Sequence, residues 1–311
     1  MAAVLAAGAV HAQWTPTKPV RCIVPSSPGG AADASARLLA DGVTRVIGQR
    51  VVVENRAGAS GNIGSELAAR ATPDGYTWLM INNAQAANVS LFKNLSYDLL
   101  RDFAPVTQVD AAPHVVVVHP TLPAKSIGEL VKLARARPGQ LDYASAGLGT
   151  VTFLAAEIFN AQAGIQLRHV PYRGGGESLT SIVAGETIVY FSPLPVALAH
   201  MKSGRLRALA VTSKQRAAAA PEIPTVAESG YPKYEFSLWN GLLVPAKTPR
   251  EIVVAVRNAA ALALNAPELR SRMSAMSVTP MAGSPEDFSA FLKSEVEAIA
   301  AVVRRLNLKA D

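Results

Sequence analysis

Residues 20–47, with the sequence VRCIVPSSPGGAADASARLLADGVTRVI, contain the pattern that most limits how this chain can fold. A short apolar run precedes the breaker-rich residues 25–30, and apolar residues then recur at helical spacing from Ala31 onward. This order predicts a strand, a glycine loop and a helix. Gly29 and Gly30 let a ligand approach the backbone, and the first helical turn offers unpaired N–H groups and the positive end of the helix dipole. Such a unit is suited to binding a small anion.

The same order of apolar run, loop and helix recurs later in the chain. It is predicted at residues 141–151, 167–177 and 187–195. Two further strands are predicted at residues 51–53 and 76–81, and Asn83 follows the second of them. Because strand and helix alternate, these strands should be parallel with right-handed crossovers. Ligands of open parallel sheets lie at the carboxyl ends of the strands, so Asn83 is a candidate ligand contact.

The length of the chain predicts two domains. A chain of 311 residues that is half hydrophobic can bury two cores. Two late helices, each predicted to carry proline at its first position (Pro249 and Pro285), have no strands of their own and must pack on the first sheet. The predicted fold is therefore α/β, with two doubly wound domains: residues 13–112 plus 236–311, and residues 113–235. Two chain crossings make a hinge, with a ligand cleft between the domains.

Residues 1–12 differ from the rest of the chain and predict export. They are small and apolar and end at Val10-His11-Ala12, which is typical of the hydrophobic region and cleavage site of a secretory signal. No Lys or Arg precedes Lys18, so we interpret the segment as the remnant of a signal peptide. Cys22 is the only cysteine, which excludes a disulfide framework and a thiolate metal site. Export without disulfides favours the bacterial periplasm.

The charge pattern and the motifs predict no catalysis, cofactor, metal or nucleic acid. The net charge of +7 is spread along the chain and forms no basic stripe with interleaved aromatic residues. The motifs G-x-S-x-G, H-E-x-x-H, C-x-x-C and G-K-[ST] are absent. Arg173 lies beside three glycines and either is solvated or contacts a carboxylate. Asp33 lies four residues before Arg37; it either pairs with that arginine or lies near a ligand.

Eight segments, spread over nearly all of the mature length, together resemble one known family. They are VPSSPGGAADASAR (24–37), ENRAGASGNIG (54–64), PDGY (73–76), YDLLRDFAPV (97–106), LDYASAGLGT (141–150), VPYRGGG (170–176), RLRALAVTS (205–213) and WNGLLVPAKTP (239–249). In order and spacing they resemble the solute-binding proteins of tripartite tricarboxylate transporters, the Bug family. The resemblance implies a type II periplasmic-binding-protein-like fold that closes on its ligand. It also implies delivery of that ligand to a membrane permease with one large and one small subunit.

The resemblance also implies where the ligand binds. Backbone amides of the first loop would hold a carboxylate, with ordered water assisting, while the second domain reads the distal end of the ligand. Carried onto this chain, the first-loop positions are Ser26, Ser27, Gly29, Gly30 and Ala31, and the facing positions are Ser145, Gly149, Thr150, Arg173, Gly174 and Ser192.

Two positions depart from the family pattern. Ile188 and Ser192 stand where aspartate is frequent in this family. The loss of an aspartate that would face an ammonium group argues against an amino-acid ligand. The expected ligand is a di- or tricarboxylate or an aromatic carboxylate without a primary amine, bound by a monomer. A periplasmic sensor for a signalling partner is the alternative. An enzyme on the same scaffold, such as a lyase or hydrolase, is a weaker one because no histidine falls in a glycine loop.

Overall fold

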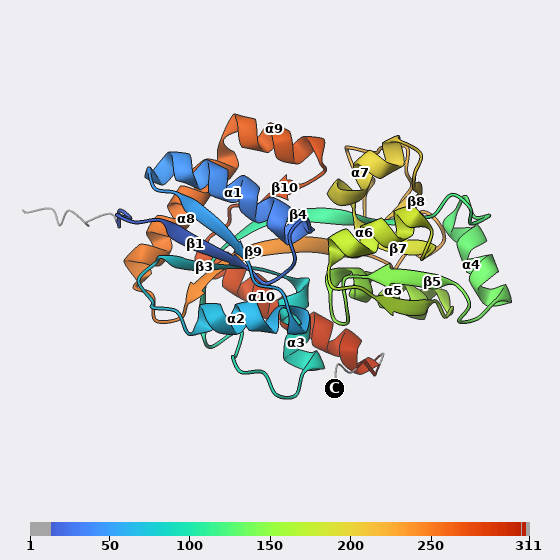
Figure 1. Cartoon of the computed structure of the whole chain (residues 1–311), viewed down its shortest axis with the longest axis horizontal. Coiled ribbons are helices and arrows are strands. Elements are labelled where there is room, and N and C mark those ends of the chain that lie inside the picture. Colours follow the sequence, from blue (N-terminus) through green and yellow to red (C-terminus); the bar gives the residue numbers. More distant parts are fainter. Residues whose placement is uncertain (1–13, 306, 309–311) are drawn as a thin grey trace, which may run out of the picture.

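The computed structural model describes residues 14–305 and 307–308, and these form two α/β lobes that lie side by side (Figure 1). Across the described residues one ten-stranded mixed sheet has the order β2-β1-β3-β9-β4-β7-β5-β6, with β8 and β10 also pairing with β4. The two-lobed α/β fold predicted from the sequence is confirmed. The predicted signal remnant, residues 1–12, lies outside the described residues.

The first lobe contains the half of the sheet that extends from β2 to the first part of β4. Its strands are β1 (Val20–Val24), β2 (Val51–Asn55), β3 (Thr77–Asn82), β9 (Ser237–Pro245), the first part of β4 (Phe103–Val118) and β10 (Thr279–Pro280). Its helices are α1 (Ala31–Ile47), η1 (Ala59–Gly61), α2 (Asn62–Ala69), α3 (Asn83–Leu91), α8 (Arg250–Asn265), α9 (Pro267–Ala275) and α10 (Pro285–Arg305). As predicted, β1 runs parallel to both β2 and β3, while β9 is antiparallel to β3 and β4.

The second lobe repeats the arrangement of the first. Its strands are β5 (Asp142–Ser145), β6 (Arg168–Pro171), β7 (Val189–Pro193), β8 (Arg207–Val211) and the last part of β4. Its helices are α4 (Ile127–Ala136), α5 (Val151–Ala163), α6 (Gly175–Ala184) and α7 (Leu194–Lys202). The order β6-β5-β7-β4 matches β2-β1-β3-β9, with three parallel strands followed by an antiparallel one. Each lobe therefore presents the carboxyl ends of three parallel strands at one edge.

The opening strand–loop–helix unit forms because its apolar residues face one core. In α1, Leu39 and Val43 are buried on the side that faces the sheet. Gly48 ends the helix in the left-handed conformation, with φ of 69°, and its N–H donates to the Thr44 carbonyl at 3.1 Å. The helix therefore begins directly after the glycine loop and is held rigidly on the sheet.

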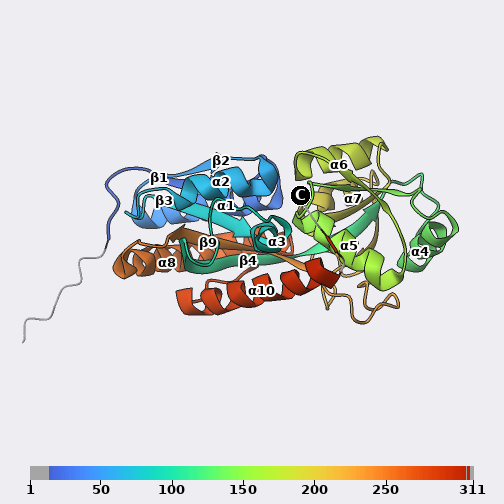
Figure 2. The same cartoon turned by 90° about the horizontal axis from the view of Figure 1, so that it is seen from below.

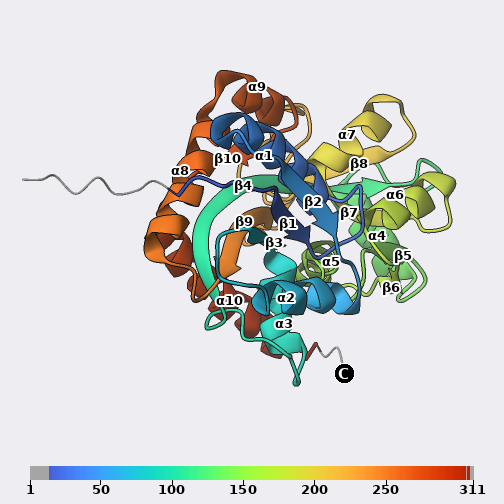
Figure 3. The ribbon, with the colours of Figure 1, turned by 60° about the vertical axis from the view of Figure 1, so that its left-hand side comes forward.

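Strand β4 connects the lobes. It begins at Phe103, extends to Val118 and curls strongly around the first lobe (Figure 3). Two register shifts in its pairing with β9 accommodate Pro105 and the neighbouring residues. Its partner changes from β9 to β7 and β8 between Pro113 and His114. This change falls one residue beyond the predicted boundary after residue 112, and the chain returns near Phe236, so the boundaries after residues 112 and 235 stay a prediction.

The carboxyl-terminal helices pack on the first lobe, as predicted (Figure 2). Helix α8 contacts α1 and β4, and α10 contacts α3 and β4. The contact with α10 is close: a Cβ on Gly241 of β9 would lie 2.0 Å from the Phe288 ring. Helix α9 was not predicted. Among the described residues no single helix is both long and apolar enough to cross a membrane; only α8 and α9 together, bent by 67°, reach that length and composition.

Serine and proline lie at several helix starts. Ser126 caps α4, where its Oγ accepts the Glu129 N–H at 3.2 Å. Pro285 is the first residue of α10, as predicted, but Pro249 is the N-cap of α8 and not its first residue. Ser65 lies inside α2, which begins at Asn62.

Candidate ligand-binding site

A cavity of about 520 Å³ lies between the two lobes and is lined by residues from both. The first lobe contributes residues at or after the carboxyl ends of β1, β2 and β3, and the second lobe contributes residues at or after the carboxyl ends of β5, β6 and β7. The repeated strand order explains this, because it brings the carboxyl ends of three parallel strands from each lobe to the same place. The cavity is therefore the cleft predicted between the lobes.

Six helix N-termini meet at this cavity, three from each lobe. The residues that cap them and line the cavity are Gly30 (α1), Gly61 (α2), Asn82 (α3), Thr150 (α5), Gly174 (α6) and Pro193 (α7). The residues capping α4, α8 and α9 do not line it. Each N-terminus carries a partial positive charge, so their convergence makes the cavity electropositive although few charged side chains are present.

Five of these six helices have no cap from a described side chain, so most of their first-turn amides are available to a ligand. An exception in α2 is its first residue, Asn62, whose N–H donates to the Ala59 carbonyl. In contrast, Asn82 caps its own helix α3 by accepting the Ala84 N–H at 2.8 Å, and Gln85 Oε1 accepts the Asn82 N–H at 3.0 Å. Helix α7 has proline near its start and so offers fewer N–H groups. The free donors therefore come mainly from α1 and α2 on one side and from α5 and α6 on the other.

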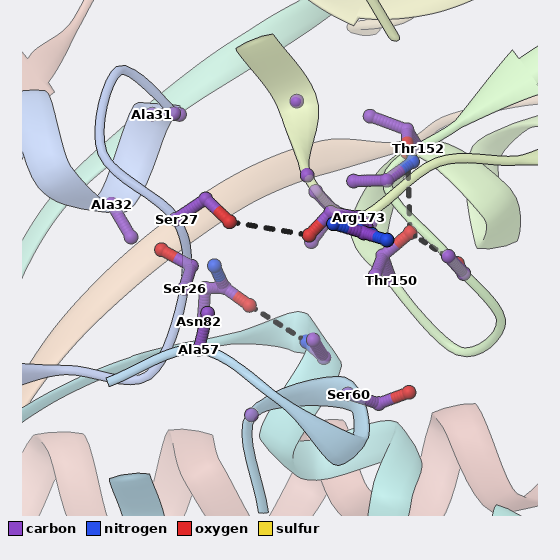
Figure 4. Close-up of a pocket in the computed structure, with 18 of the residues that line it drawn as sticks. Ser26, Ser27, Ala31, Ala32, Ala57, Ser60, Asn82, Thr150, Thr152 and Arg173 are labelled. Carbon is purple, nitrogen blue, oxygen red and sulfur yellow. Dashed lines mark hydrogen bonds between the residues drawn. The ribbon is translucent and has the colours of Figure 1, made fainter. Parts of the chain in front are cut away.

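Seven of the thirteen residues predicted to bind ligand line the cavity. They are Ser26, Ser27, Gly30, Ala31, Thr150, Arg173 and Gly174. Figure 4 shows Ser26, Ser27 and Ala31 on one side, with Thr150 and Arg173 facing them from the second lobe. Thr150 Oγ1 donates to the Gly147 carbonyl at 2.6 Å, which holds the loop before α5. That these residues contact a ligand remains a prediction.

The structure does not bring Gly29 and Asp33 to the cavity, because they bond to each other. The Gly29 N–H donates to Asp33 Oδ2 at 3.0 Å, so it is not available to a ligand. Asp33 also forms an ion pair with Arg37 at 2.9 Å. Burial alone would raise the pKa of the Asp33 carboxyl, but hydrogen bonds from Arg37 and Gly29 outweigh it and lower that pKa below its usual value. The predicted Asp33–Arg37 pair is therefore present, and Asp33 holds the first loop in place.

Asn83 also lies away from the cavity. Its Nδ2 donates to the Ser237 carbonyl at 3.3 Å and its Oδ1 accepts the Trp239 N–H at 3.1 Å, so it fixes β9 near the chain crossing. The preceding residue, Asn82, lines the cavity instead, because β3 passes directly into α3 without a loop. The predicted residue, Asn83, is therefore adjacent to Asn82, which lines the cavity.

Ser145 and Gly149 belong to the loop before α5 but do not line the cavity. Ser145 is buried, and its Oγ lies 2.5 Å from His169 Nε2 and accepts the Gly147 N–H at 3.1 Å. Burial lowers the pKa of His169 to about 4, so the imidazole is neutral at pH 7. Gly149 has φ of 75°, and a Cβ there would lie 2.5 Å from Leu91 Cδ1 of the first lobe. Ser145 therefore stabilises the loop before α5. Gly149 lets that loop contact Leu91 of the other lobe.

The two positions that depart from the family pattern also lie off the cavity. Ser192 is fully buried and its Oγ donates to the Pro193 carbonyl at 3.1 Å. Ile188 packs against the main hydrophobic core. Neither position therefore faces the cavity, and any argument about the ligand must rest on residues that do.

Several residues that line the cavity were not predicted. They include Ala57, Ser60, Asn82, Gln85, Thr152, Tyr172, Gly175, Glu177 and Tyr190. The loop after β2 was recognised as glycine-rich, and its position after a parallel strand was the signal that could have placed it at the site. Tyr190 carried no such signal, because it lies inside β7.

Only two charged side chains are found among the described residues of the lining. They are Arg173 and Glu177, both exposed. Glu177 Oε2 accepts the Arg173 N–H at 3.1 Å, so it acts within its own loop. The electropositive character of the cavity therefore comes mainly from main-chain amides, with one guanidinium beside them.

Two α/β lobes of repeated topology, which enclose a cavity between the carboxyl ends of their strands, define a receptor of the periplasmic-binding-protein type. Residues 35–308 match the family described as "Tripartite tricarboxylate transporter family receptor", and the chain belongs to that family. BugT of Bordetella pertussis is 35% identical over 97% of this chain and 94% of its own length. The Bug-family resemblance seen in the sequence is confirmed.

Solved structures agree with this assignment. The R. palustris protein Rpa4515, determined with adipate, superimposes with a TM-score of 0.91 at 31% identity, covering 94% of this chain and 99% of that one. MatC (Rpa3494) from Rhodopseudomonas palustris, with bound malate, gives 0.88 at 27% identity, covering 93% and 99%. The family and these neighbours are solute-binding receptors and not enzymes, and the receptors of this family are periplasmic.

Proposed function

We propose that this protein captures a small carboxylate between its lobes and delivers it to a membrane transporter of the tripartite tricarboxylate type. The observation that carries the proposal is the convergence of six helix N-termini on one cavity, five of them without a cap from a described side chain. Free amides at the positive ends of helices favour an anion with several acceptor oxygens, such as a carboxylate. The adipate and malate bound by two structural neighbours support the same ligand class.

The ligand proposed here is a di- or tricarboxylate or an aromatic acid that lacks a primary amine. An ammonium group inside the cavity would need an acidic partner, and Glu177 is the only acid among the described lining residues. Its carboxylate already accepts the Arg173 N–H. An amino acid would therefore leave a charge without a counter-ion in the cavity, which is unfavourable.

Capture would occur by closure of the lobes. The two crossings, at Pro113–His114 in β4 and near Phe236, supply a hinge between residues 13–112 plus 236–311 and residues 113–235. The lobes already touch beside the cavity lining, because Ser60 Oγ donates to the Leu148 carbonyl at 3.0 Å. Closure excludes water from the amides and gives the transporter a surface that differs from that of the open form.

Titration calorimetry with the purified protein tests the ligand class. The panel comprises adipate, malate, citrate and benzoate, with aspartate and glutamate as amine-bearing carboxylates and adipamide as a neutral match for adipate. We expect at least one amine-free carboxylate to bind in the micromolar range or tighter, and adipamide and the amino acids to bind far more weakly. Tight binding of aspartate or glutamate without a response to the amine-free acids would refute the proposal.

Delivery is tested in cells. Deleting the gene from its host should abolish uptake of the radiolabelled carboxylate that binds most tightly, and a plasmid copy should restore it. Unchanged uptake would refute the transport role. The proposed periplasmic location of the mature monomer is checked by osmotic-shock fractionation followed by light scattering of the released protein.

A further inference from the structure

The buried hydroxyl of Tyr190 lies at the cavity without a hydrogen-bond partner among the described residues. The residue lies in β7, its exposed fraction is 0%, and it is part of the cavity lining. Its Oη makes no hydrogen bond within the described part of the chain. Buried hydroxyls are nearly always paired because an unpaired one is destabilising. The unpaired hydroxyl is therefore a candidate to bind an acceptor atom of the ligand.

Two glycines from opposite lobes lie near this hydroxyl. A Cβ on Gly175 would lie 3.6 Å from Tyr190 Oη and 4.0 Å from Gly30 Cα. Gly175 is the first residue of α6, and Gly30 caps α1. The hydroxyl therefore lies where two helix N-termini meet, and neither of these helices has a side-chain cap.

The surroundings leave the Tyr190 hydroxyl free to donate. Burial raises the pKa of the Tyr190 phenol above its usual 10, only partly offset by the nearby Ser178 hydroxyl, so the group keeps its proton at neutral pH. Ser178 Oγ itself donates to the Gly174 carbonyl at 3.0 Å. The free amides of α1 and α6 are donors as well. Among the described residues, no group at this junction accepts a hydrogen bond from the Tyr190 hydroxyl.

We propose that the Tyr190 hydroxyl donates a hydrogen bond to an oxygen of the bound carboxylate at the junction of α1 and α6. This inference rests on the proposed function and adds a specificity-determining side chain to a site otherwise made mainly of backbone. A ligand without an acceptor oxygen at this point leaves the hydroxyl unpaired, so the residue discriminates against it.

Tyr190→Phe tests the proposal by two readouts. Calorimetry with the tightest-binding carboxylate of the panel should show affinity weakened about tenfold or more, because a hydrogen bond to a charged group is lost. The thermal unfolding midpoint of the ligand-free variant should stay unchanged or rise, because no internal hydrogen bond is removed. The matched control is Tyr234→Phe, whose buried hydroxyl donates to the Ala155 carbonyl at 2.9 Å away from the cavity. It should lower the midpoint and leave the affinity unchanged.

A second pair of variants tests the position of the hydroxyl without altering it. Gly175→Ala places a methyl group between Tyr190 Oη and Gly30 at ordinary contact distances, so the fold should be retained while the affinity falls at least tenfold. The control Gly128→Ala, on α4 of the same lobe, adds a Cβ that meets nothing closer than 3.9 Å, and Gly128 does not line the cavity. It should bind the carboxylate as the unmodified protein does.

The outcomes separate this inference from the proposed function. If Tyr190→Phe binds as tightly as the unmodified protein, or its ligand-free midpoint falls as far as that of Tyr234→Phe, the inference is overturned while carboxylate binding stands. If the unmodified protein binds no carboxylate of the panel, the proposed function and this inference are overturned together.

Discussion

Ser27 Oγ in the first lobe donates a hydrogen bond of 3.2 Å to the Arg173 carbonyl oxygen in the second lobe (Figure 4). The two residues are 146 positions apart in the chain and belong to the loops that precede α1 and α6. Next to this bond, a Cβ on Gly174 would lie 2.9 Å from both Cβ and Oγ of Ser27. The lobes can therefore come together here only because residue 174 has no side chain.

Gly174→Ala should hold the cavity open. Gly174 has φ of 177°, an extended conformation that alanine adopts without strain, so the effect is purely a clash between lobes. We expect carboxylate affinity to fall at least tenfold while the unfolding midpoint changes little. Small-angle scattering with saturating ligand should show a larger radius of gyration than for the unmodified protein.

Removing the opposing side chain supplies the control. Ser27→Gly in the Gly174→Ala background deletes both atoms that the new methyl group meets, so affinity should recover by more than half of the loss on a logarithmic scale. If Gly174→Ala binds and closes normally, contact between these loops is not what closes the cavity.

Gly241→Ala should strongly destabilise the first lobe. The added methyl group would lie 2.0 Å from the Phe288 ring, so α10 must shift away from β9. We expect the free energy of unfolding in urea to fall by about 3 kcal/mol. Gly128→Ala on α4 is the control, because its Cβ meets nothing closer than 3.9 Å and should be neutral or slightly stabilising. A loss below about 0.5 kcal/mol for Gly241→Ala would contradict the packing described for α10.

Asp110 should make the protein less stable as pH rises. It is fully buried between β9 and α1, where Asn240 Nδ2 donates to its Oδ1 at 2.7 Å, and burial raises the pKa of its carboxyl from 3.8 to about 6. The folded protein therefore keeps this proton between pH 4 and pH 6 while the unfolded chain loses it. The contribution to stability is present below pH 4 and declines as pH rises to 6, by on the order of 3 kcal/mol.

Asp110→Asn should remove that dependence. The amide is neutral at every pH, and its new N–H₂ group can donate to Asn240 Oδ1, which has no partner among the described residues. Urea unfolding should show the variant more stable than the unmodified protein at pH 7 and nearly equal to it at pH 4. The exposed Asp41→Asn on α1 should show no such pattern. Equal stability of Asp110→Asn and the unmodified protein at pH 7 would mean that the carboxyl is not held protonated.

Arg173→Gln should weaken binding only modestly. The side chain is exposed, so its interaction with a ligand is screened, while the amides remain in place. We expect a three- to tenfold loss of affinity at about 0.05 M salt, and a smaller loss at about 0.5 M. Arg205→Gln, exposed on the same lobe and away from the cavity, should change nothing. Complete loss of binding in Arg173→Gln would show that the guanidinium, not the backbone, holds the anion.

The fold was predictable where sequence signals are local. The loop before α1 combines Pro25 and Pro28 with two glycines, and both the strand before it and the helix after it were predicted correctly. Strand β4 was not, because Pro105 and Pro113 argue against a strand and only tertiary pairing with β9 overrides them. Helix α9 is similar: its low amphipathicity gave no periodic signal.

The site was predictable to the level of loops but not of side chains. Parallel-strand topology places the right loops at one cavity, yet it does not show that Gly29 N–H is occupied by Asp33 or that Asn83 turns toward β9. Asp33 and Asn83 can each form hydrogen bonds with several kinds of group, so the sequence alone does not show which bond forms. Tyr190 reaches the cavity from inside a strand, past the glycines of α6, and such an approach depends on the packing of a neighbouring helix.

Amide NMR of the ¹⁵N-labelled protein, titrated with the tightest-binding carboxylate, tests the central claim most directly. If main-chain donors hold the anion, the largest shifts should fall on the first-turn amides of α1, α2, α5 and α6, and those of α4, α8 and α9 should stay unchanged. The neutral amide of the same ligand should shift none of these first-turn amides. Shifts of equal size at the starts of α4, α8 and α9, or none at the starts of α1 and α6, would contradict the account.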